Sequence, residues 1–396
     1  MKILVVCNNM SVGGVRSSMM NFLRKILKDS DCCHIQPLKY DDEMFAQSVN
    51  DSVCNISVKN KLFFYDAYYE QISSLRKKKA YLSLCFKIIF ALLRKIIGAE
   101  KVLTLICKFS SCKDSYDLAI SYENDIWNGK YFSGGANQFV IEKVKAVKTI
   151  AWVHSEPSYY GLTHNRGLKS FREFDAIVNV SYACKHLFDS IVPEYTAKSF
   201  VVYNFFDELS VSKKAQDLCP IEFSKLFNIV TVSRIVDKAK KIERVIHISK
   251  ILRDRGVLFS WYVVGDGPLL EKMRNLVKEF KLEKSVCFLG QVVEPYNYVS
   301  KCDLFVLPSE QESFGMVLVE SLLCGVPVVC TNYAASSEIV ENGKNGLIVE
   351  NSVEKIADAI EKIAKSEVVF RKEDIVFSNK AEKQFSHLLS FLGMPK

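Results

Sequence analysis

Two glutamates, Glu312 and Glu320, lie on either side of a predicted helix start, with seven residues between them. The apolar run 304–307 predicts a buried strand, and Pro308 ends it because proline cannot donate to a strand ladder. Gly315 then opens a helix whose apolar positions recur with helical spacing. Free backbone N–H groups at a helix start attract phosphate, whereas carboxylates accept hydrogen bonds from hydroxyl groups. A sugar nucleotide offers both partners.

Two cations follow the strand predicted for 228–232. Arg234 comes directly after this strand, and Lys240 follows six residues later before a helix. An arginine fork and a lysine point charge at one sheet edge suit a diphosphate. Lys238 and Lys241 compete with Lys240 for this role, and all three lysines would also fit a solvated helix face.

Each half of the chain has a pair of glycines after a predicted strand. Gly265 and Gly267 follow the strand predicted for 259–264, where they let the backbone approach a ligand or make a tight turn. Leu270 stands where a dinucleotide-binding motif has its third glycine, so that motif is incomplete. In the first half, Gly13 and Gly14 separate a strand at 3–6 from a helix at about 16–27 and predict a second phosphate approach.

The segment 308–329 resembles the Glu-x7-Glu signature of family 4 retaining glycosyltransferases, which have the GT-B fold. This resemblance assigns the donor diphosphate to Arg234 and Lys240 and the nucleotide's ribose hydroxyls to Glu320. It places Glu312 near the transferred sugar and its reacting carbon. It implies that the backbone amides of Ser313, Phe314 and Gly315 lie near the sugar and phosphate. It also implies a loop near the nucleotide at Gly265 and a wall for the base at Val292 and Val293.

In the first half, the resemblance implies that His154 is the cleft histidine close to the donor sugar, because it follows a strand at 149–153. A lone histidine in this position can also be structural. Arg16 is expected to contact phosphate or acceptor, or to lie free on the surface. The turns Val-Ser-x3-Lys from Val180 and Asn-x2-Asp from Asn204 also match the family and are expected to be structural.

The mechanism implied by the resemblance keeps the anomeric configuration of the sugar. Arg234, Lys240 and the helix dipole would stabilise the departing nucleoside diphosphate, and its phosphate would take the acceptor proton. No Asp-x-Asp motif beside a strand demands a divalent metal. The expectation is therefore metal-independent transfer, no cofactor, and a donor that is a UDP-sugar.

Strands alternate with helical stretches through both halves, which predicts two doubly wound α/β domains. The expected GT-B arrangement has an acceptor-side domain at 1–206, a nucleotide-sugar domain at 207–380 and a helix at 381–396 that returns to the first domain. A polar stretch at 207–217 is expected to be a linker. Ligands of such folds bind beyond the carboxyl ends of the strands, so the interdomain cleft is the expected site.

Composition excludes several classes of protein. With 49% hydrophobic and 25% charged residues, the 396-residue chain is neither disordered nor fibrous. The thirteen cysteines include no Cys-x2-Cys pair, which argues against a zinc ribbon and fits a reducing cytosol. The start of the chain is expected to be a strand rather than a signal peptide, and no run of eighteen apolar residues exists to span a bilayer.

The net charge of +8 arises entirely before residue 206, and residues 76–113 hold ten basic residues against the single acid Glu100. Within the basic helical segment 72–113, four cations recur every seven residues, at Lys87, Arg94, Lys101 and Lys108. With the apolar residues between them they predict a helix with a cationic edge that lies on an anionic membrane, with Gly98 as a possible break. A core-packing helix with a solvated basic face is the alternative. Nucleic acid is not expected, because no binding module accompanies the charge.

These features together predict a cytoplasmic enzyme, peripheral on the inner face of the cell membrane. It would transfer a hexosyl unit from a nucleotide diphosphate sugar to a lipid-linked or polysaccharide acceptor during surface glycan biosynthesis. Two other functions stay open at this point. One is a sugar-nucleotide 2-epimerase of the same fold, and the other is a non-catalytic partner subunit.

Overall fold

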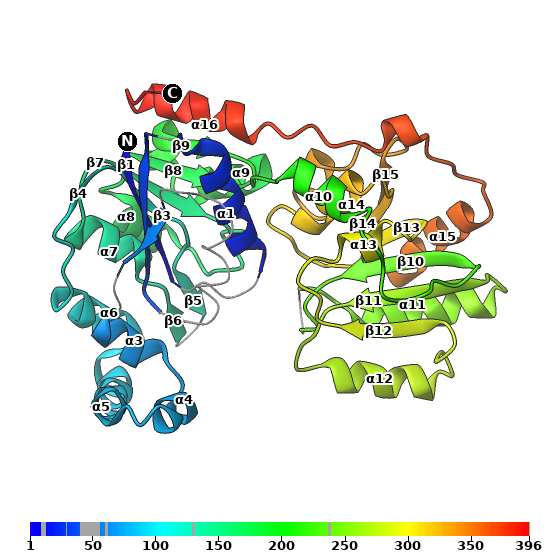
Figure 1. The fold of residues 1–396 in the computed structure, drawn as a ribbon, viewed down its shortest axis with the longest axis horizontal. Coiled ribbons are helices and arrows are strands. Elements are labelled where there is room, and N and C mark those ends of the chain that lie inside the picture. The colour runs from blue at the N-terminus through cyan, green and yellow to red at the C-terminus, as the bar shows by residue number, and fades with distance from the viewer. Residues whose placement is uncertain are drawn as a thin grey trace. The chain divides into compact units, whose positions relative to one another are not determined.

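The computed structural model describes residues 1–8, 13–28, 30–39, 56–59, 62–128, 131–236 and 239–395. The chain forms two compact units, Met1–Phe206 with Lys380–Lys396 and Asp207–Asn379. Each unit contains a parallel sheet covered by helices (Figure 1). The fold is thus α/β, with two doubly wound domains as the alternation of strands and helices predicts.

The first unit has a seven-stranded parallel sheet in the order β3-β2-β1-β4-β7-β8-β9. Its strands are β1 Lys2–Cys7, β2 Cys32–Pro37, β3 Ile56–Val58, β4 Ser115–Ser121, β7 Lys145–Val153, β8 Ala176–Asn179 and β9 Ser199–Val201. A short antiparallel pair, β5 Ile126–Asn128 and β6 Tyr131–Ser133, lies outside this sheet. The central strands are buried on both faces, as expected for a parallel sheet between helices.

The helices of the first unit are α1 Gly14–Ile26, α3 Phe63–Tyr69, α4 Ile72–Lys77, α5 Tyr81–Ile97, α6 Ala99–Lys108, α7 Ala136–Lys143, α8 His164–Phe171, α9 Tyr182–Ile191 and α16 Ala381–Phe391. Gly98, with φ 86°, separates α5 from α6, so the predicted break in the basic segment is confirmed. The expected single cationic stripe is wrong, because Lys87 and Arg94 lie on α5 whereas Lys101 and Lys108 lie on α6.

The C-terminal helix α16 packs on the first unit. Phe385 is buried, and its ring lies 5.0 Å from that of Phe22 in an edge-on arrangement and 6.1 Å from that of Trp152. The Gln384 side-chain oxygen accepts a hydrogen bond of 2.9 Å from the backbone N–H of Tyr203. These contacts hold the end of the chain against α1, β7 and the segment after β9.

The second unit has a six-stranded parallel sheet in the order β12-β11-β10-β13-β14-β15. Its strands are β10 Phe227–Val232, β11 Phe259–Val264, β12 Val286–Gly290, β13 Leu304–Leu307, β14 Val328–Thr331 and β15 Gly346–Val349. The helices are α10 Glu208–Lys214, α11 Glu243–Asp254, α12 Leu270–Glu279, α13 Tyr296–Val299, α14 Met316–Leu323 and α15 Val353–Ala364. The predicted strands and helices of this half are all present, with bounds that differ by one or two residues.

The expected linker at 207–217 is wrong, because most of it forms α10. Asp207 caps this helix: its side chain accepts a 3.0 Å hydrogen bond from the backbone N–H of Ser210. Val211 is buried, and the Ser300 hydroxyl donates to the carbonyl of Ala215 at 2.6 Å. The polar composition therefore marks the solvent face of a capped helix that belongs to the second unit.

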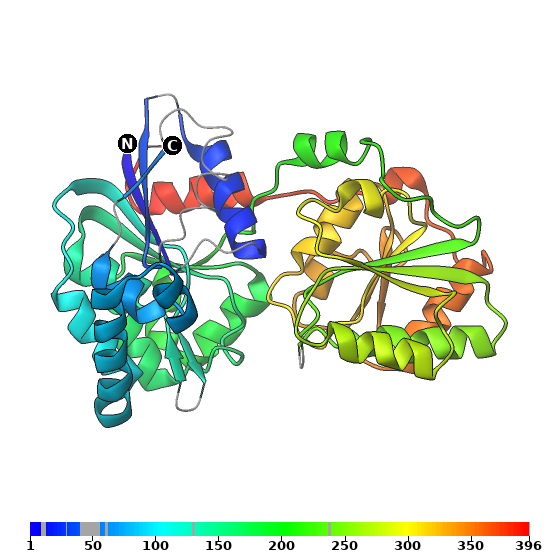
Figure 2. The same ribbon diagram turned by 60° about the horizontal axis from the view of Figure 1, so that its bottom comes forward.

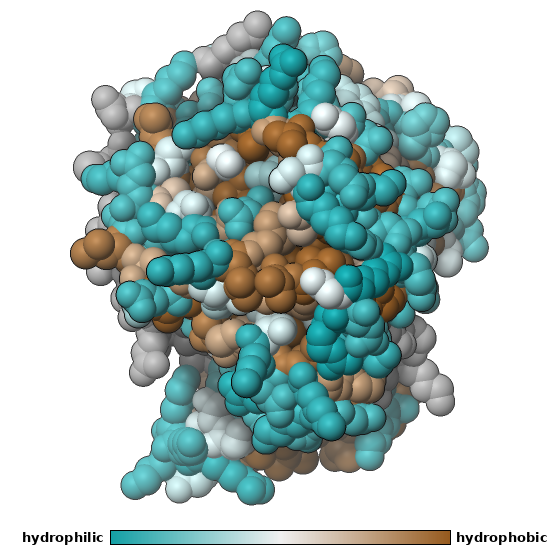
Figure 3. All heavy atoms as spheres, turned by 90° about the vertical axis from the view of Figure 1, so that its right-hand side faces the viewer, coloured by the Kyte–Doolittle hydropathy of each residue, from teal (hydrophilic) through white to brown (hydrophobic). Residues whose placement is uncertain are grey.

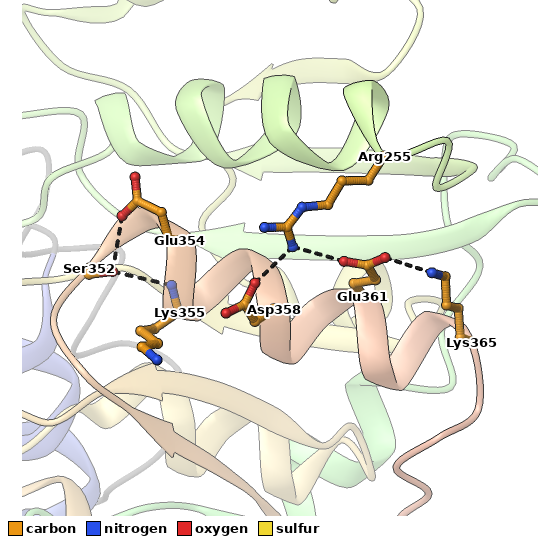
Figure 4. Close-up of polar contacts among 7 residues, drawn as sticks. All are labelled: Arg255, Ser352, Glu354, Lys355, Asp358, Glu361 and Lys365. Atoms are coloured by element: carbon orange, nitrogen blue, oxygen red, sulfur yellow. Dashed lines mark hydrogen bonds and ion pairs between the residues drawn. The ribbon is translucent and has the colours of Figure 1, made fainter.

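Helices α11 and α15 pack together through buried isoleucines and are joined at the surface by Arg255 (Figure 4). Its guanidinium lies 2.8 Å from both Asp358 and Glu361, and Lys365 pairs with Glu361 at 2.6 Å. Since exposed ion pairs contribute ~0–1 kcal/mol each, the apolar contact dominates the stability of this pair of helices.

The surface in Figure 3 is mainly hydrophilic, with apolar side chains gathered near the middle of that view. No helix in the described part of the chain is both long enough and apolar enough to cross a bilayer.

Candidate functional site

The loop from β13 to α14 is fixed in place by buried contacts. Gly315 begins α14 with φ 101°, and a side chain there would lie 2.3 Å from the Tyr333 hydroxyl oxygen. That hydroxyl donates to the carbonyl of Phe314 at 2.9 Å, and Phe314 itself is buried. The Thr331 hydroxyl donates to the carbonyl of Ser309. The loop therefore holds Glu312 and Ser313 in a set position at the start of α14.

Lys240 and Glu312 form an ion pair. The Lys240 ammonium donates to both carboxylate oxygens of Glu312, at 2.7 and 2.8 Å, and the Ser309 hydroxyl donates to one of them at 2.8 Å. The two side chains meet because β10 and β13 are neighbours in the sheet, so the loops after them lie at one edge. Glu312 is only 11% exposed, which strengthens the pair relative to a surface ion pair.

The competing lysines are placed differently. Lys241 pairs with Glu310 at 2.7 Å, and both side chains are more exposed than the Lys240–Glu312 pair. Lys238 lies outside the residues that the structure describes. Of the two lysines described, Lys240 is thus the one at the loop that carries Glu312.

Arg234 follows β10 directly and is exposed. Its guanidinium makes no hydrogen bond or ion pair with any residue of the described ranges. A cation that pairs with no acid of the described ranges is able to accept an anion without first giving up one of those partners.

Glu320 lies in the second turn of α14 and is largely enclosed. Burial raises the pKa of its carboxyl to about 7. Burial is the main cause that raises the pKa of the Tyr296 phenol, and the charge of Glu320 is the second. Tyr296 and Glu320 therefore lie near one another. Within the described part of the chain, no group hydrogen-bonds the Glu320 carboxyl. Glu320 keeps partial exposure, so ligand hydroxyls would be able to donate to its carboxyl.

Gly265 joins the ends of three strands. Its N–H donates to the carbonyl of Gly290 at 2.7 Å, and with φ 146° it passes so close to Ser233 that a side chain would lie 1.9 Å from that carbonyl oxygen. Ile235 donates to the carbonyl of Asp266 at 2.9 Å. The structure therefore gives this glycine a packing role: it holds the loop that carries Arg234.

Val292 lies half-buried in the loop after β12, and its neighbour Val293 is exposed. The loop leads into α13, whose Tyr296 lies near Glu320. The expected base-binding wall and the expected ribose-binding acid thus belong to one region of the second unit.

In the first unit, Gly13 caps the start of α1 with an extended backbone, and a side chain there would meet nothing within 4 Å. Gly14 is the first residue of α1, and Arg16 lies half-buried in its first turn, where burial lowers the pKa of the guanidinium. The extended backbone of Gly13 is open to any residue, so backbone strain does not require a glycine there. The loop residues 9–12 lie outside the described ranges.

His154 follows β7 and is held on several sides. Its ring stacks on that of Trp152 with centroids 6.0 Å apart and lies 4.6 Å from the ring of Tyr122. The Asn124 side-chain oxygen accepts hydrogen bonds from the backbone N–H groups of His154 and Ser155, at 3.1 and 3.2 Å.

Burial lowers the pKa of His154 to about 3, and a hydrogen bond with the Asn204 side chain opposes this only in part. The ring is therefore neutral at physiological pH. Its Nε2 is buried and has no partner among the described residues. A neutral imidazole can exchange a hydrogen bond with a sugar hydroxyl, but it carries no positive charge to stabilise a phosphate.

The family comparison addresses the region where these cations and acids lie. Residues 221–384 match the model of the family described as glycosyl transferases group 1. This match covers β10 to α15 and includes Arg234, Lys240, Glu312 and Glu320. The chain carries a glycosyl transferases group 1 domain. The family resemblance expected from the Glu-x7-Glu segment is confirmed.

Two curated proteins are similar to parts of this chain. N-acetyl-alpha-D-glucosaminyl L-malate synthase of Bacillus anthracis is 29% identical over 224 residues, which cover 54% of this chain and 57% of that protein. N-acetylgalactosamine-N,N'-diacetylbacillosaminyl-diphospho-undecaprenol 4-alpha-N-acetylgalactosaminyltransferase of Campylobacter jejuni is 34% identical over 154 residues, which cover 39% of this chain and 40% of that protein. The matches thus span about half or less of the length of these relatives.

The fold is similar to that of a solved structure over nearly the whole chain. HepE of Anabaena, in complex with UDP, matches with a TM-score of 0.62 at 18% identity, and the match covers 99% of this chain and 98% of that one. The two-sheet arrangement is therefore that of the GT-B glycosyltransferases, as expected.

Besides the expected residues, the geometry of the transferase domain and of the first unit identifies three that the sequence analysis did not assign. Tyr296 borders Glu320, Asn124 positions the His154 backbone, and Asn204 hydrogen-bonds the His154 ring. The Asn-x2-Asp motif from Asn204 was the available signal for the last of these. In the ranges that the structure describes, no three His, Cys, Asp or Glu side chains are grouped so that they could hold a metal ion.

Proposed function

We propose that this protein is a retaining glycosyltransferase of surface glycan biosynthesis. It would move a hexosyl unit from a UDP-linked sugar to a hydroxyl of a lipid-linked or polysaccharide acceptor, without a metal ion or cofactor. The transferase domain, the similarity to the Campylobacter jejuni transferase named for a diphospho-undecaprenol substrate, and the UDP bound to HepE support this proposal. Of the alternatives left open above, no observation favours the epimerase or the non-catalytic subunit.

The observation that carries the proposal is the pairing of Lys240 with Glu312, in the same unit as Arg234 and as Glu320, whose carboxyl accepts no hydrogen bond from a described residue. The cations suit a diphosphate, and the two acids suit hydroxyl groups. Glu312 is the counter-ion of Lys240 in this structure. A donor that supplies a diphosphate to Lys240 and a sugar hydroxyl to Glu312 satisfies both groups at once.

In the proposed reaction, the bond between the anomeric carbon and the diphosphate oxygen breaks. Arg234, Lys240 and the N-terminus of α14 stabilise the charge that develops on the leaving diphosphate. The acceptor hydroxyl oxygen forms its new bond on the same face of the sugar, and its proton passes to the leaving phosphate. Glu320 and Val292 hold the nucleotide, and the neutral His154 exchanges a hydrogen bond with the donor sugar.

The donor is identified by incubating the purified protein with a panel of nucleotide sugars and measuring the free nucleotide released by slow hydrolysis. We expect a UDP-sugar to be preferred and the rate to be unchanged by chelator. An NMR spectrum of the released sugar at early times should show the donor's anomeric configuration. Activity lost on chelation and restored by manganese would contradict metal independence, and an altered sugar released without acceptor would indicate an epimerase.

The role of Lys240 is tested by Lys240→Met with Lys241→Met as its matched control. Lys240→Met removes the charge beside Glu312, so it should weaken UDP binding by about tenfold or more, since a charge-assisted hydrogen bond contributes about 1.5–3 kcal/mol. Lys241→Met removes only an exposed pair with Glu310 and should change binding less than about threefold. Calorimetric titration with UDP gives both values. Equal effects of the two substitutions would reject the assignment of Lys240.

We further propose that the protein is cytoplasmic and peripheral on the inner face of the cell membrane, where lipid-linked acceptors would be available. The exposed apolar side of helix α5 in the first unit supports this proposal of membrane contact.

A further inference from the structure

Helix α5 of the first unit exposes an apolar face. Five of its large apolar side chains are between 46% and 78% exposed: Leu82, Ile88, Ile89, Leu92 and Ile96. Tyr81 at the start of the helix is also exposed. Leu82, Ile89, Leu92 and Ile96 follow one another at spacings of seven, three and four residues, and Ile88 lies four residues before Leu92, which places all five on one side of the helix. Helices α4 and α5 project from the rest of the first unit in Figure 1, and α5 also extends beyond it in Figure 2.

The opposite side of α5 is already covered by protein. Phe90 is buried, and its ring lies 6.4 Å from that of Phe64 and 6.2 Å from that of Tyr68, both on α3. Phe86 packs against Phe64 at 5.0 Å. The helix is therefore apolar on two sides, and among the described residues of the unit only the inner side has a packing partner. Packing against α3 explains why the inner side of α5 is apolar. The same packing gives no reason for the outer side to be apolar.

Other exposed apolar residues do not form such a helical face. Leu218, Leu226, Leu258 and Val369 are strongly exposed, but each lies in a separate loop or strand-flanking segment of the second unit. Single exposed hydrophobic residues are normal on protein surfaces, whereas a contiguous row along one helix marks an interaction site.

The cations of this region are arranged differently from the expected stripe. Lys87 donates to the backbone carbonyl of Tyr68, and Arg94 lies near the Tyr68 phenol, where it opposes part of the rise in that group's pKa that burial causes. Lys87 therefore serves the contact with α3. The cations exposed beside the apolar face are Arg76, Lys77, Lys78, Lys79 and Lys95.

We propose that the apolar face of α5 inserts into the interface of an anionic lipid membrane, with the lysines of the α4–α5 turn contacting lipid phosphates. Residues 71–97 contain seven basic residues and no acid, so the charge complements anionic lipid. A second copy of this chain is a poorer partner, because two α5 faces would bring two sets of like charges together. This inference is independent of the transfer reaction, which concerns other residues.

The test uses the full chain with vesicles of phosphatidylcholine alone and of phosphatidylcholine with phosphatidylglycerol, followed by flotation. We expect the wild type to float with the anionic vesicles. Ile88→Ser/Leu92→Ser/Ile96→Ser should lower the bound fraction by about tenfold or more, because each substitution removes a large inserted side chain. Lys77→Gln/Lys78→Gln/Lys79→Gln should lower it comparably and remove most of its salt dependence.

The matched control is Leu226→Ser/Leu258→Ser/Val369→Ser, which removes three exposed apolar side chains from the second unit and should leave flotation unchanged. Donor hydrolysis, measured on the same preparations, should be retained in every variant and shows that each is folded. The proposal fails if the wild type does not float, or if the control lowers flotation as much as the α5 variant. It also fails if the wild type is a dimer that the α5 substitutions dissociate, since the face would then bind a second copy.

Discussion

Glu320 combines burial, a raised pKa and the absence of a hydrogen bond from any described residue. With a pKa of about 7, this carboxyl is about half protonated at neutral pH. Ribose hydroxyls that donate to the carboxylate would favour the ionised form instead. The residue that we assign to the nucleotide is thus a group whose protonation is linked to binding.

We therefore predict that nucleoside binding by the second unit strengthens as pH rises through about 7. Below this pH, binding must remove a proton from Glu320, so the affinity for uridine should fall about tenfold between pH 8 and pH 6. Uridine is the suitable probe because it carries no phosphate that titrates in this range. Glu320→Gln should bind more weakly at pH 8 and show no such pH dependence. A variant with the same pH profile as the wild type would exclude Glu320 as the linked group.

Among the elements, the loops after β10, β11 and β12 form one structure through backbone contacts. Gly265 is central, because its missing side chain lets the loop after β11 pass the carbonyl of Ser233. Arg234 follows Ser233 in sequence. The position of this cation therefore depends on Gly265, which follows the neighbouring strand β11. The sequence interpretation of Gly265 as a ligand-approach position did not include this packing role.

Gly265→Ala should destabilise the second unit more than Gly256→Ala, which serves as the control. Both glycines have a positive φ, but a side chain at Gly256 would meet nothing within 4 Å. The left-handed conformation should cost Gly256→Ala about 1–2 kcal/mol. The overlap with Ser233 should add about 1–3 kcal/mol to the cost in Gly265→Ala. Urea unfolding of the two variants measures the difference, and equal losses would show that the loop relaxes freely.

In the whole molecule, the first unit is built from two segments of the chain that are separated in sequence by the second unit. The chain leaves the first unit after Phe206, forms the second unit, and returns with α16. Phe385 fills a site between Phe22, Trp152 and Phe205, so the first unit lacks part of its core until the last residues are in place.

Phe385→Ala should lower the stability of the first unit by about 3–5 kcal/mol, as expected for removal of a buried phenylalanine. Phe391→Ala is the control, because Phe391 lies on the same helix and is half-exposed, and its effect should be much smaller. Scanning calorimetry with and without UDP separates the units, since UDP should shift the transition of the second unit. If Phe385→Ala moved only the UDP-sensitive transition, the assignment of α16 to the first unit would be wrong.

The sequence by itself determined the alternation of strands and helices, because apolar runs and helical periodicity are local properties. It also singled out Arg234, Lys240, Glu312 and Glu320 as polar residues at predicted strand ends and at a helix start. Strands such as β2 and β15 were not predicted, since His34 and Gln36 interrupt the apolar pattern of β2 and pairing with β1 decides its conformation.

Only the tertiary structure decided which side chains meet. It paired Lys240 with Glu312 and Lys241 with Glu310, although all four lie in polar segments that look alike in sequence. It turned Lys87 toward Tyr68 and left the apolar side of α5 exposed, so the expected stripe of cations is replaced by the exposed cations before α5. The physical reason is the same in each case: pairing and burial depend on neighbours distant along the chain, and a local pattern does not specify those neighbours.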